Sequence, residues 1–159
     1  MSAIENLSAI ALAAAVRARR LSAVEVARRY LDRAAALGER LGCFLHLDPA
    51  DVLAQAAAVD QAVGTGADLP LAGVPVGLKD LLCTRGVPTT CGSRILQGFV
   101  PPYDATVVAR LRAAGAVLFA KLNMDEFAMG SSNETSCYGD VISPWRRQGS
   151  DAALTPGGS

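Results

Sequence analysis

Apolar residues in the first half of the chain recur mainly at helical spacing. The pattern predicts three helices and one short strand, over residues 8–20, 22–37, 50–63 and 43–47. Ser22 followed by Glu25 is a capping box for the second helix, and Asp48 with Pro49 is typical of the start of the third. The segment of about residues 1–65 is therefore expected to be mainly helical.

The second half alternates strand and helix. It is predicted to contain a strand, a helix and a second strand, over residues 74–78, 104–115 and 116–120. Because 116–120 is entirely apolar, this strand is expected to be covered on both faces. Pro75 places the earlier strand at a sheet edge or marks its first residues, and Gly115 is expected at the C′ position of the helix. The order predicts an α/β layered core over about 70–159, with a mixed, largely parallel sheet.

The composition is that of an ordinary globular protein. Of the 159 residues, 51% are hydrophobic and 19% charged, and 15 basic residues balance 15 acidic ones. A zero net charge argues against a chain that binds nucleic acid through its own electrostatic field. A cluster of arginines near the start is interpreted as the solvated face of two helices: Arg17, Arg19, Arg20, Arg28 and Arg29.

The cysteine pattern and the N-terminus narrow the class of protein further. Four scattered cysteines without a C-x-x-C pair, and a single histidine, predict no metal site and reduced, structural thiols. Glu5 precedes the first apolar stretch and arginines follow it, which is the reverse of a secretory signal. No apolar run reaches the roughly 18 residues that a membrane span needs. We therefore expect a cytoplasmic protein without a membrane partner.

One lysine interrupts the apolar run GVPVGLKDLL. Lys79 either extends its ammonium to water beside Asp80 or provides an amine for catalysis in a site from which water is excluded. The segments NMDEFAMGSS and PGGS could act with it, although PGGS alone is most simply a turn. Asp125 and Glu126 are interpreted as charges stabilised by a helix dipole rather than as catalytic carboxylates.

Loop chemistry dominates from Gly130 onward. Glycine, serine, proline and asparagine are frequent there, and a loop this long is usually functional or disordered. The sequence stops at Ser159, inside a glycine-serine run, so we expect an incomplete domain. Such a domain would expose sheet edges and be marginally stable or prone to aggregation.

Three stretches together resemble the amidase signature family. They are LAGVPVGLKDLLCTRGVPTTCGS, PPYDATVVARLRAAGAVLFAKLNMDEFAMGSSNETSCYG and SPWRRQGSDAALTPGGS. Within the family they are similar to the A subunits of the bacterial glutamyl-tRNA(Gln)/aspartyl-tRNA(Asn) amidotransferases. NMDEFAMGSS is specific to that branch, whereas many amidases share GVPVGLKD. The resemblance covers nearly the whole chain, which corresponds to the N-terminal portion of a single amidase domain.

The resemblance implies a serine–serine–lysine triad that hydrolyses amides. Lys79 matches the family's lysine, and Ser159 matches the bridging serine that follows a cis peptide bond. The nucleophilic serine would lie further along the chain than Ser159. Substrate binding is implied for Met129, Gly130, Ser131 and Ser132. A lysine that acts as a base must be neutral near pH 7, which burial among apolar neighbours favours.

The implied activity is release of ammonia from the side-chain amide of glutamine. In the family complex, a carbon–nitrogen ligase, a partner subunit uses this ammonia with ATP and Mg to convert Glu-tRNA(Gln) to Gln-tRNA(Gln). The implied partners are the B and C subunits of a heterotrimeric amidotransferase; tRNA is contacted only indirectly, and this chain binds no cofactor. Two alternatives stay open: another amidase-signature hydrolase, and a non-catalytic remnant or assembly fragment. Without the nucleophile, residues 1–159 alone are expected to be inactive, and the acceptor tRNA, Gln or Asn, is open.

Overall fold

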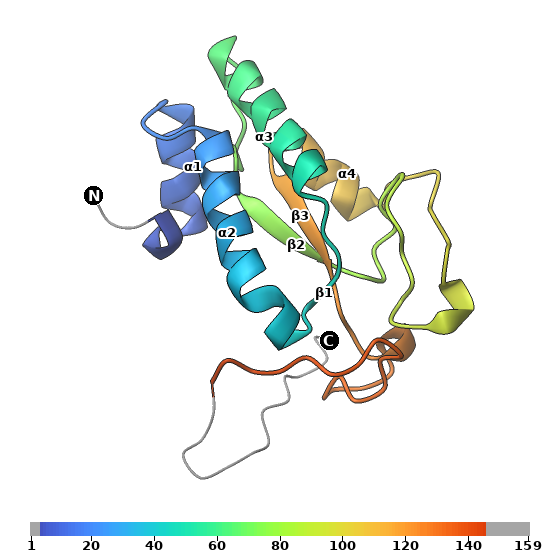
Figure 1. Cartoon of the computed structure of the whole chain (residues 1–159). Coiled ribbons are helices and arrows are strands. Elements are labelled where there is room, and N and C mark those ends of the chain that lie inside the picture. Colours follow the sequence, from blue (N-terminus) through green and yellow to red (C-terminus); the bar gives the residue numbers. More distant parts are fainter. Residues whose placement is uncertain (1–3, 146–159) are drawn as a thin grey trace. The chain divides into compact units, whose positions relative to one another are not determined.

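The computed structural model describes residues 4–145, which form two compact units. One unit comprises residues 4–35, 48–77 and 106–119, and the other comprises 36–47, 78–105 and 120–145. The elements, in chain order, are η1 (Ile4–Asn6), α1 (Ala9–Arg17), α2 (Ala23–Leu41), β1 (Phe44–His46), α3 (Pro49–Gly64), β2 (Pro75–Lys79), η2 (Arg94–Leu96), α4 (Thr106–Ala113), β3 (Val117–Leu122) and η3 (Glu126–Ala128) (Figure 1).

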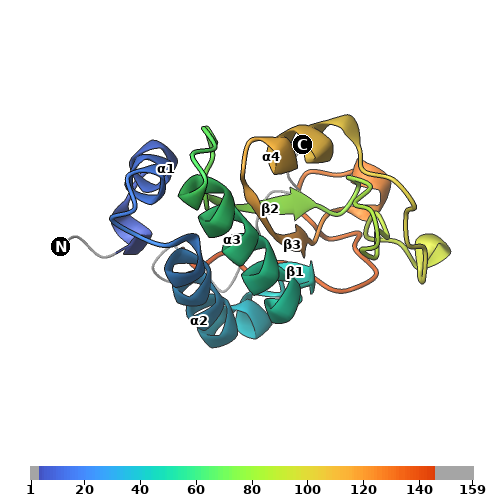
Figure 2. The ribbon, with the colours of Figure 1, turned by 90° about the horizontal axis from the view of Figure 1, so that it is seen from above.

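The predicted helices and strands are all present, with ends that shift by a few residues. Asp48 caps α3 by accepting hydrogen bonds from the N–H groups of Ala50 and Asp51, with Pro49 in the first turn, as predicted. In the first unit α1 packs against α3, and the two helices lie close together in Figure 2. No helix within residues 4–145 is both long enough and apolar enough to cross a membrane.

Three strands form one mixed sheet in the order β1-β3-β2. β1 pairs with β3 antiparallel, with Phe44 opposite Leu122. Between β2 and β3, the Val117 N–H donates to the Val74 carbonyl at 2.9 Å and the Asp80 N–H donates to the Leu122 carbonyl at 3.1 Å. Because both residue numbers rise together, β2 and β3 run parallel. The predicted mixed sheet is confirmed, with β2 and its Pro75 at an edge of the three strands.

β3 is the central strand and is nearly completely buried. Five of its six residues are buried, as its apolar sequence predicted. A side chain of α3 supplies hydrogen bonds at Leu118: the Gln55 carboxamide oxygen accepts from the Leu118 N–H at 3.0 Å, and its nitrogen donates to the Leu118 carbonyl at 3.2 Å. Gln55 therefore replaces a strand neighbour and satisfies backbone groups that would otherwise be unpaired.

Gly115 ends α4 as predicted. It has φ +83°, and the Ala116 N–H donates to the Leu111 carbonyl while its own N–H donates to the Arg112 carbonyl. This pair of bonds is the Schellman motif, which satisfies the last carbonyls of a helix. A Cβ at Gly115 would also lie 2.8 Å from the Leu69 Cβ, so both the backbone conformation and the packing require glycine here.

Arg19 was predicted to lie on a solvated helix face, but its side chain makes specific hydrogen bonds to another helix. α1 ends at Arg17, and Arg19 adopts a left-handed conformation with φ 54°. Its guanidinium donates to the Val63 and Gly64 carbonyls. These carbonyls lie at the C-terminus of α3, where the helix dipole favours a cation. Arg19 therefore ties the end of α1 to the end of α3.

Asp60 connects α3 to the start of α2. Its carboxylate accepts hydrogen bonds from the N–H groups of Ala23, at 2.6 Å, and Val24, at 3.1 Å. The Ser22 hydroxyl accepts from the Glu25 N–H at 2.9 Å, which is one of the two bonds of the predicted capping box. Together they satisfy N–H groups that the first turn of α2 leaves without a helical partner.

We expect Asp60→Ala to reduce the free energy of unfolding by about 1–2 kcal/mol, because two N–H groups at the start of α2 lose their acceptor. Urea denaturation followed by circular dichroism measures this change. Asp68→Ala is the matched control: its side chain is 90% exposed and lies 3.7 Å from the Arg17 guanidinium. It is expected to change the free energy by less than about 0.5 kcal/mol. Equal effects of the two substitutions would contradict the capping role of Asp60.

Candidate active site

Two lysines lie near the carboxyl ends of two adjacent parallel strands. They are the only lysines among the 15 basic residues of the chain. Lys79 is the last residue of β2, and Lys121 is the last but one of β3. Parallel strands end at the same edge of a sheet, where α/β proteins usually place their sites. The predicted substrate-binding residues follow β3 along the chain, so they are reached from this edge.

Lys79 is half-buried. Side chains alternate along a strand, so Leu78 and Asp80, both buried, lie on one side of the chain and Lys79 on the other. Its role as the base stays a prediction. Ser159, the predicted bridging serine, lies outside the described residues.

The lysine that this chain buries completely is Lys121, at 2% exposure. Its Nζ lies 3.0 Å from Asp80 Oδ1 and donates to Thr89 Oγ1 at 2.7 Å and to the Pro88 carbonyl at 3.4 Å. Asp80 Oδ2 accepts from the Thr90 N–H at 2.8 Å and from the Thr90 hydroxyl at 2.6 Å. Burial lowers the pKa of Lys121, and the Asp80 carboxylate only partly opposes this change.

Sequence reasoning missed this buried network. It ended the strand at Ala120, one residue before Lys121, and considered Asp80 only as a surface neighbour of Lys79. The available signal was the position of Lys121 directly after an apolar strand that was itself expected to be buried. A lysine in such a place is rarely buried without a partner of opposite charge.

Asp125 organises the loop after β3, and its interpretation as a helix-dipole charge is wrong. η3 has three residues, Phe127 within it has a non-helical φ of 51°, and Asp125 makes no side-chain capping bond to it. Instead, Asp125 is fully buried and accepts hydrogen bonds from the Asn133 N–H at 3.0 Å, the Thr135 N–H at 3.3 Å and the Thr135 hydroxyl at 3.0 Å. Burial acts to raise the pKa of Asp125, but these bonds outweigh it and lower the pKa.

The predicted substrate-binding loop, Met129–Ser132, passes directly over Asp125. Met129 is 74% exposed, and Gly130 and Ser131 are also exposed. Ser132 is half-buried, and its hydroxyl donates to Glu134 Oε2. A Cβ added to Gly130 would lie 2.6 Å from Asp125 Oδ1, so this close approach requires glycine. The loop is therefore anchored by Asp125 while its outer residues remain accessible.

Possible metal ligands are scattered within the described residues, and two of the four thiols have a raised pKa. Within residues 4–145, no three histidine, cysteine, aspartate or glutamate side chains form a group that could hold a metal ion. All four cysteines are free thiols. Burial raises the pKa of Cys43 and of Cys91, which makes these two thiols poorer nucleophiles at neutral pH.

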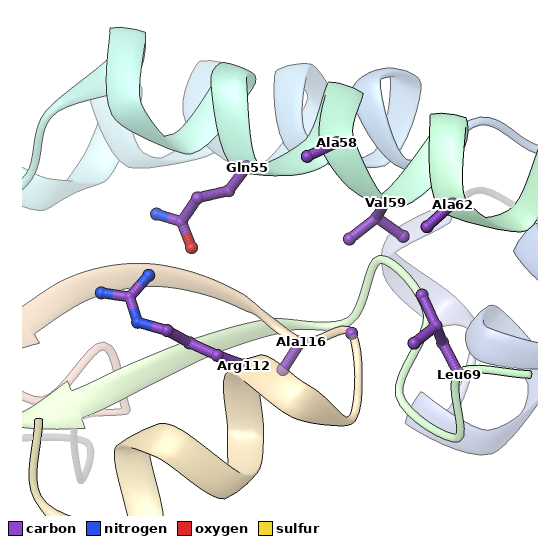
Figure 3. Close-up of a pocket in the computed structure, with 8 residues that line it drawn as sticks. Gln55, Ala58, Val59, Ala62, Leu69, Arg112 and Ala116 are labelled. Atoms are coloured by element: carbon purple, nitrogen blue, oxygen red, sulfur yellow. The ribbon is translucent and has the colours of Figure 1, made fainter. Parts of the chain in front are cut away.

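A cavity of about 270 Å³ in the first unit is not a candidate for this chemistry. Figure 3 shows its mainly apolar lining, formed by Gln55, Ala58, Val59, Ala62, Leu69, Arg112, Gly115 and Ala116. The Gln55 carboxamide is already bound to the Leu118 backbone and to Asp51. None of the predicted site residues lines this cavity.

Residues 25–159 match the Amidase family. The chain belongs to this family. It is 51% identical, over its whole length, to the A subunit of glutamyl-tRNA(Gln) amidotransferase from Acidothermus cellulolyticus, and 50% identical over 98% of its length to the same protein from Dinoroseobacter shibae. It covers 31% and 32% of these proteins, so this amidase-family chain spans about a third of the length of the curated relatives.

Solved structures of the family share the fold. A native peptide amidase from Stenotrophomonas maltophilia has a TM-score of 0.73 and 38% identity, over 88% of this chain and 28% of its own. The A subunit of glutamyl-tRNA(Gln) amidotransferase from Thermotoga maritima has a TM-score of 0.67 and 27% identity, over 91% and 29%. These matches confirm the amidase fold predicted from the sequence, and their low coverage agrees with an incomplete domain.

We expect Gly130→Ala to reduce the free energy of unfolding by about 1–3 kcal/mol, because its Cβ would overlap the Asp125 carboxylate. Chemical denaturation measures the change, and limited proteolysis shows whether the loop opens. Gly64→Ala is the control, since a Cβ there meets only the Arg19 guanidinium at 3.7 Å. This control is expected to be neutral or to stabilise by up to about 1 kcal/mol. A neutral Gly130→Ala variant would show that the loop is not held against Asp125.

The contribution of Asp125 to stability is expected to depend on pH. Because the folded-state pKa lies below the ordinary value of 3.8, the contribution is complete above that value and is lost as the pH falls through the lowered folded-state pKa. The thermal unfolding midpoints of wild type and Asp125→Asn should differ by a constant amount well above pH 3.8, and the difference should shrink as the pH falls below that value and the carboxylate becomes protonated. The exposed Asp68→Asn provides the reference. A difference that does not shrink as the pH falls would refute the role of the Asp125 charge.

Proposed function

We propose that this chain provides the lysine and the bridging serine of a glutamine-hydrolysing site in the A subunit of an amidotransferase. The observation that carries the proposal is the 51% identity, across the whole chain, to such a protein, compared with 38% to the peptide amidase. The position of Lys79 at the carboxyl end of β2 and the accessible loop Met129–Ser132 after β3 support it. A site at this edge can receive a small amide.

In this proposal Lys79, as the neutral amine, accepts a proton from the Ser159 hydroxyl. Ser159 accepts one from a nucleophilic serine outside residues 1–159, and that serine attacks the side-chain amide carbon of glutamine. The C–N bond breaks, the nitrogen leaves as ammonia with the transferred proton, and an acyl-enzyme remains. Water then hydrolyses the ester to release glutamate and restore the serine. The hydroxyls and backbone N–H groups of Ser131 and Ser132 would hold the substrate.

The ammonia is used elsewhere in the proposed complex. We propose the B and C subunits as partners, with ATP and Mg consumed by the partner that holds the aminoacylated tRNA. This chain then binds no cofactor and meets tRNA only through the assembly. Its zero formal net charge is compatible with that arrangement.

Hydrolysis of another amide is the second candidate function. Its support is the similarity to solved amidases, including a peptide amidase in complex with the inhibitor chymostatin, at 36% identity and a TM-score of 0.80. Co-purification with the B and C subunits distinguishes the candidates. The amidotransferase component binds them in a stoichiometric complex, whereas a stand-alone amidase acts without them.

The test of the proposed function is ammonia release from glutamine by the native full-length polypeptide. Its intact mass comes first: residues 1–159 account for 16.4 kDa, whereas the length of the relatives predicts about three times that mass. If the polypeptide contains the nucleophile, Lys79→Ala and Ser159→Ala should each lower kcat by about 10²–10⁴-fold. Arg28→Ala, on the exposed face of α2, is the control and should leave kcat unchanged.

Residues 1–159 alone are expected to release ammonia no faster than their own Lys79→Ala variant, because the proposed nucleophile lies beyond them. Ammonia release by residues 1–159 that depends on Lys79 would contradict this assignment of the triad. Unchanged activity of the full-length Lys79→Ala variant would reject the proposed function itself.

A further inference from the structure

The backbone is strained just before the predicted substrate-binding residues. Phe127 and Ala128 are not glycines, yet both lie in the left-handed region, with φ 51° and φ 61°. This region is costly for residues with a bulky or apolar side chain, and residues normally visit it singly. Such strain persists only where the surrounding structure holds it, and it is frequent at functional sites. The two residues lead directly into Met129–Ser132, so their conformation sets where that loop begins.

A segment from another part of the second unit, Cys91–Ser93, holds the loop on both sides. The Phe127 N–H donates to the Cys91 carbonyl at 2.9 Å. The Cys137 N–H donates to the Gly92 carbonyl at 3.0 Å. The first bond precedes the predicted substrate-binding residues in the chain and the second follows them. The 91–93 segment therefore fixes the backbone at the start and at the end of the loop.

Ser93 adds a side-chain contact to these backbone bonds. It is completely buried, at 0% exposure, and its hydroxyl donates to Glu126 Oε1 at 2.6 Å. The same hydroxyl oxygen accepts from the Ile95 N–H at 3.2 Å, at the start of η2. Hydrogen bonds from a hydroxyl to a carboxylate are short and stronger than bonds between neutral groups. Ser93 therefore binds the start of the loop firmly from a position that the solvent does not reach.

Glu126 transmits this contact to the strained turn. Its N–H donates to the Thr135 hydroxyl at 3.0 Å, and its carbonyl accepts from the Met129 N–H at 3.1 Å. The main chain of Glu126 is thus bonded within the loop, while its side chain binds Ser93. Without the side-chain bond, the turn that follows loses a contact that holds it in the left-handed region. Met129 belongs to the same turn, so its position would change as well.

The 91–93 segment is also attached to the end of β2. The Cys91 N–H donates to the Asp80 carbonyl at 3.3 Å, and the preceding residue, Thr90, binds the Asp80 carboxylate through its N–H and its hydroxyl. Asp80 directly follows Lys79 in the chain. One segment therefore joins the strand end that carries the proposed base to the loop that is proposed to hold the substrate.

We propose that Ser93 is a positioning residue of the amide-hydrolysing site. Through Glu126 it holds the left-handed turn and so fixes Met129–Ser132 relative to the end of β2. This inference rests on the proposed function, in which Met129–Ser132 binds the amide. Ser93 does not touch the substrate, because it is completely buried and its hydroxyl binds Glu126 and the Ile95 N–H. A loosened loop holds the substrate less well both before and during the reaction, which raises KM and leaves kcat largely unchanged.

The test compares the native full-length polypeptide with four variants: Ser93→Ala, Glu126→Ala, the double variant that combines them, and Glu126→Gln. Hydrolysis of glutamine gives kcat and KM for each protein. Hydrogen–deuterium exchange without substrate, followed by mass spectrometry, measures how readily the peptides over residues 126–136 open. The double variant separates the bond to Glu126 from the other role of Ser93 at the start of η2. Glu126→Gln keeps an acceptor oxygen in place.

Ser93→Ala and Glu126→Ala are each expected to raise KM about 10-fold, to change kcat by less than about 3-fold, and to speed exchange of the loop peptides about 10-fold. The double variant should resemble either single variant, because the two share one bond. Glu126→Gln should stay within about 3-fold of wild type in KM and in exchange. An unchanged KM in Ser93→Ala would overturn the proposal. Multiplied effects in the double variant would also overturn it, since the two side chains would then act independently.

Thr84→Val is the matched control. It removes another buried hydroxyl of the second unit, one that donates to the Leu82 carbonyl at 3.1 Å rather than to the loop. Its KM and its loop exchange should equal those of wild type. If this control shifts KM as much as Ser93→Ala does, general destabilisation explains the effect and the proposal falls.

Failure of the proposed function is visible separately, in the wild type. If wild type does not hydrolyse glutamine, KM is compared with the amide that it does hydrolyse, and the exchange measurement, which contains no substrate, still decides whether Ser93 holds the loop. Unchanged exchange in Ser93→Ala overturns the proposal in either case. Circular dichroism checks the fold of each variant. If Ser93→Ala does not fold, a loosened loop in Glu126→Ala that Glu126→Gln does not show supports the proposal, and equal behaviour of these two overturns it.

Discussion

The hydrogen bonds between β2 and β3 are the constraint on which the candidate site depends. They set a parallel register in which Asp80 meets Leu122, and this register brings the Asp80 carboxylate to Lys121. A slip of one residue would move every side chain of a strand to the opposite face. A slip of β3 would turn Lys121 away from Asp80, and a slip of β2 would turn Asp80 away and bring Lys79 to its side. The buried ion pair thus also makes the alternative register costly.

The candidate site contains two buried carboxylates that are stabilised in different ways. Asp80 is balanced by a cation, whereas Asp125 is stabilised by N–H and hydroxyl donors from the loop that it holds. The first arrangement places a buried ion pair at the end of the strand that carries Lys79. The second holds a loop proposed for substrate binding against a buried carboxylate. Both use burial to make short-range interactions stronger than they would be in water.

Periodic features of this fold were predictable from the sequence, and side-chain networks were not. The helices, the buried β3 and the cap at Gly115 follow from local patterns that act over a few residues. The partners of Lys121 and Asp125 lie in irregular loops, at Thr89 and Asn133, where no period indicates which side chains meet. Lys79 and Met129–Ser132 were located through a family resemblance. The burial of Lys121 and its pairing with Asp80 became visible only from the register of the strands in the structure. Gln55 was missed for the same reason, since nothing local shows that its amide faces Leu118.

The interleaving of the two compact units along the chain has a consequence for biosynthesis. Each unit is assembled from three separate stretches, and the last stretch of each contains part of β3: 106–119 in one unit and 120–145 in the other. A ribosome delivers the chain from its N-terminus, so α1, α2 and α3 emerge well before the strand that both units share. Contacts between residues far apart in sequence also slow folding. The helices therefore lack part of their packing partner until β3 has left the exit tunnel. Chaperones that bind nascent chains can act on the exposed apolar surface during this interval.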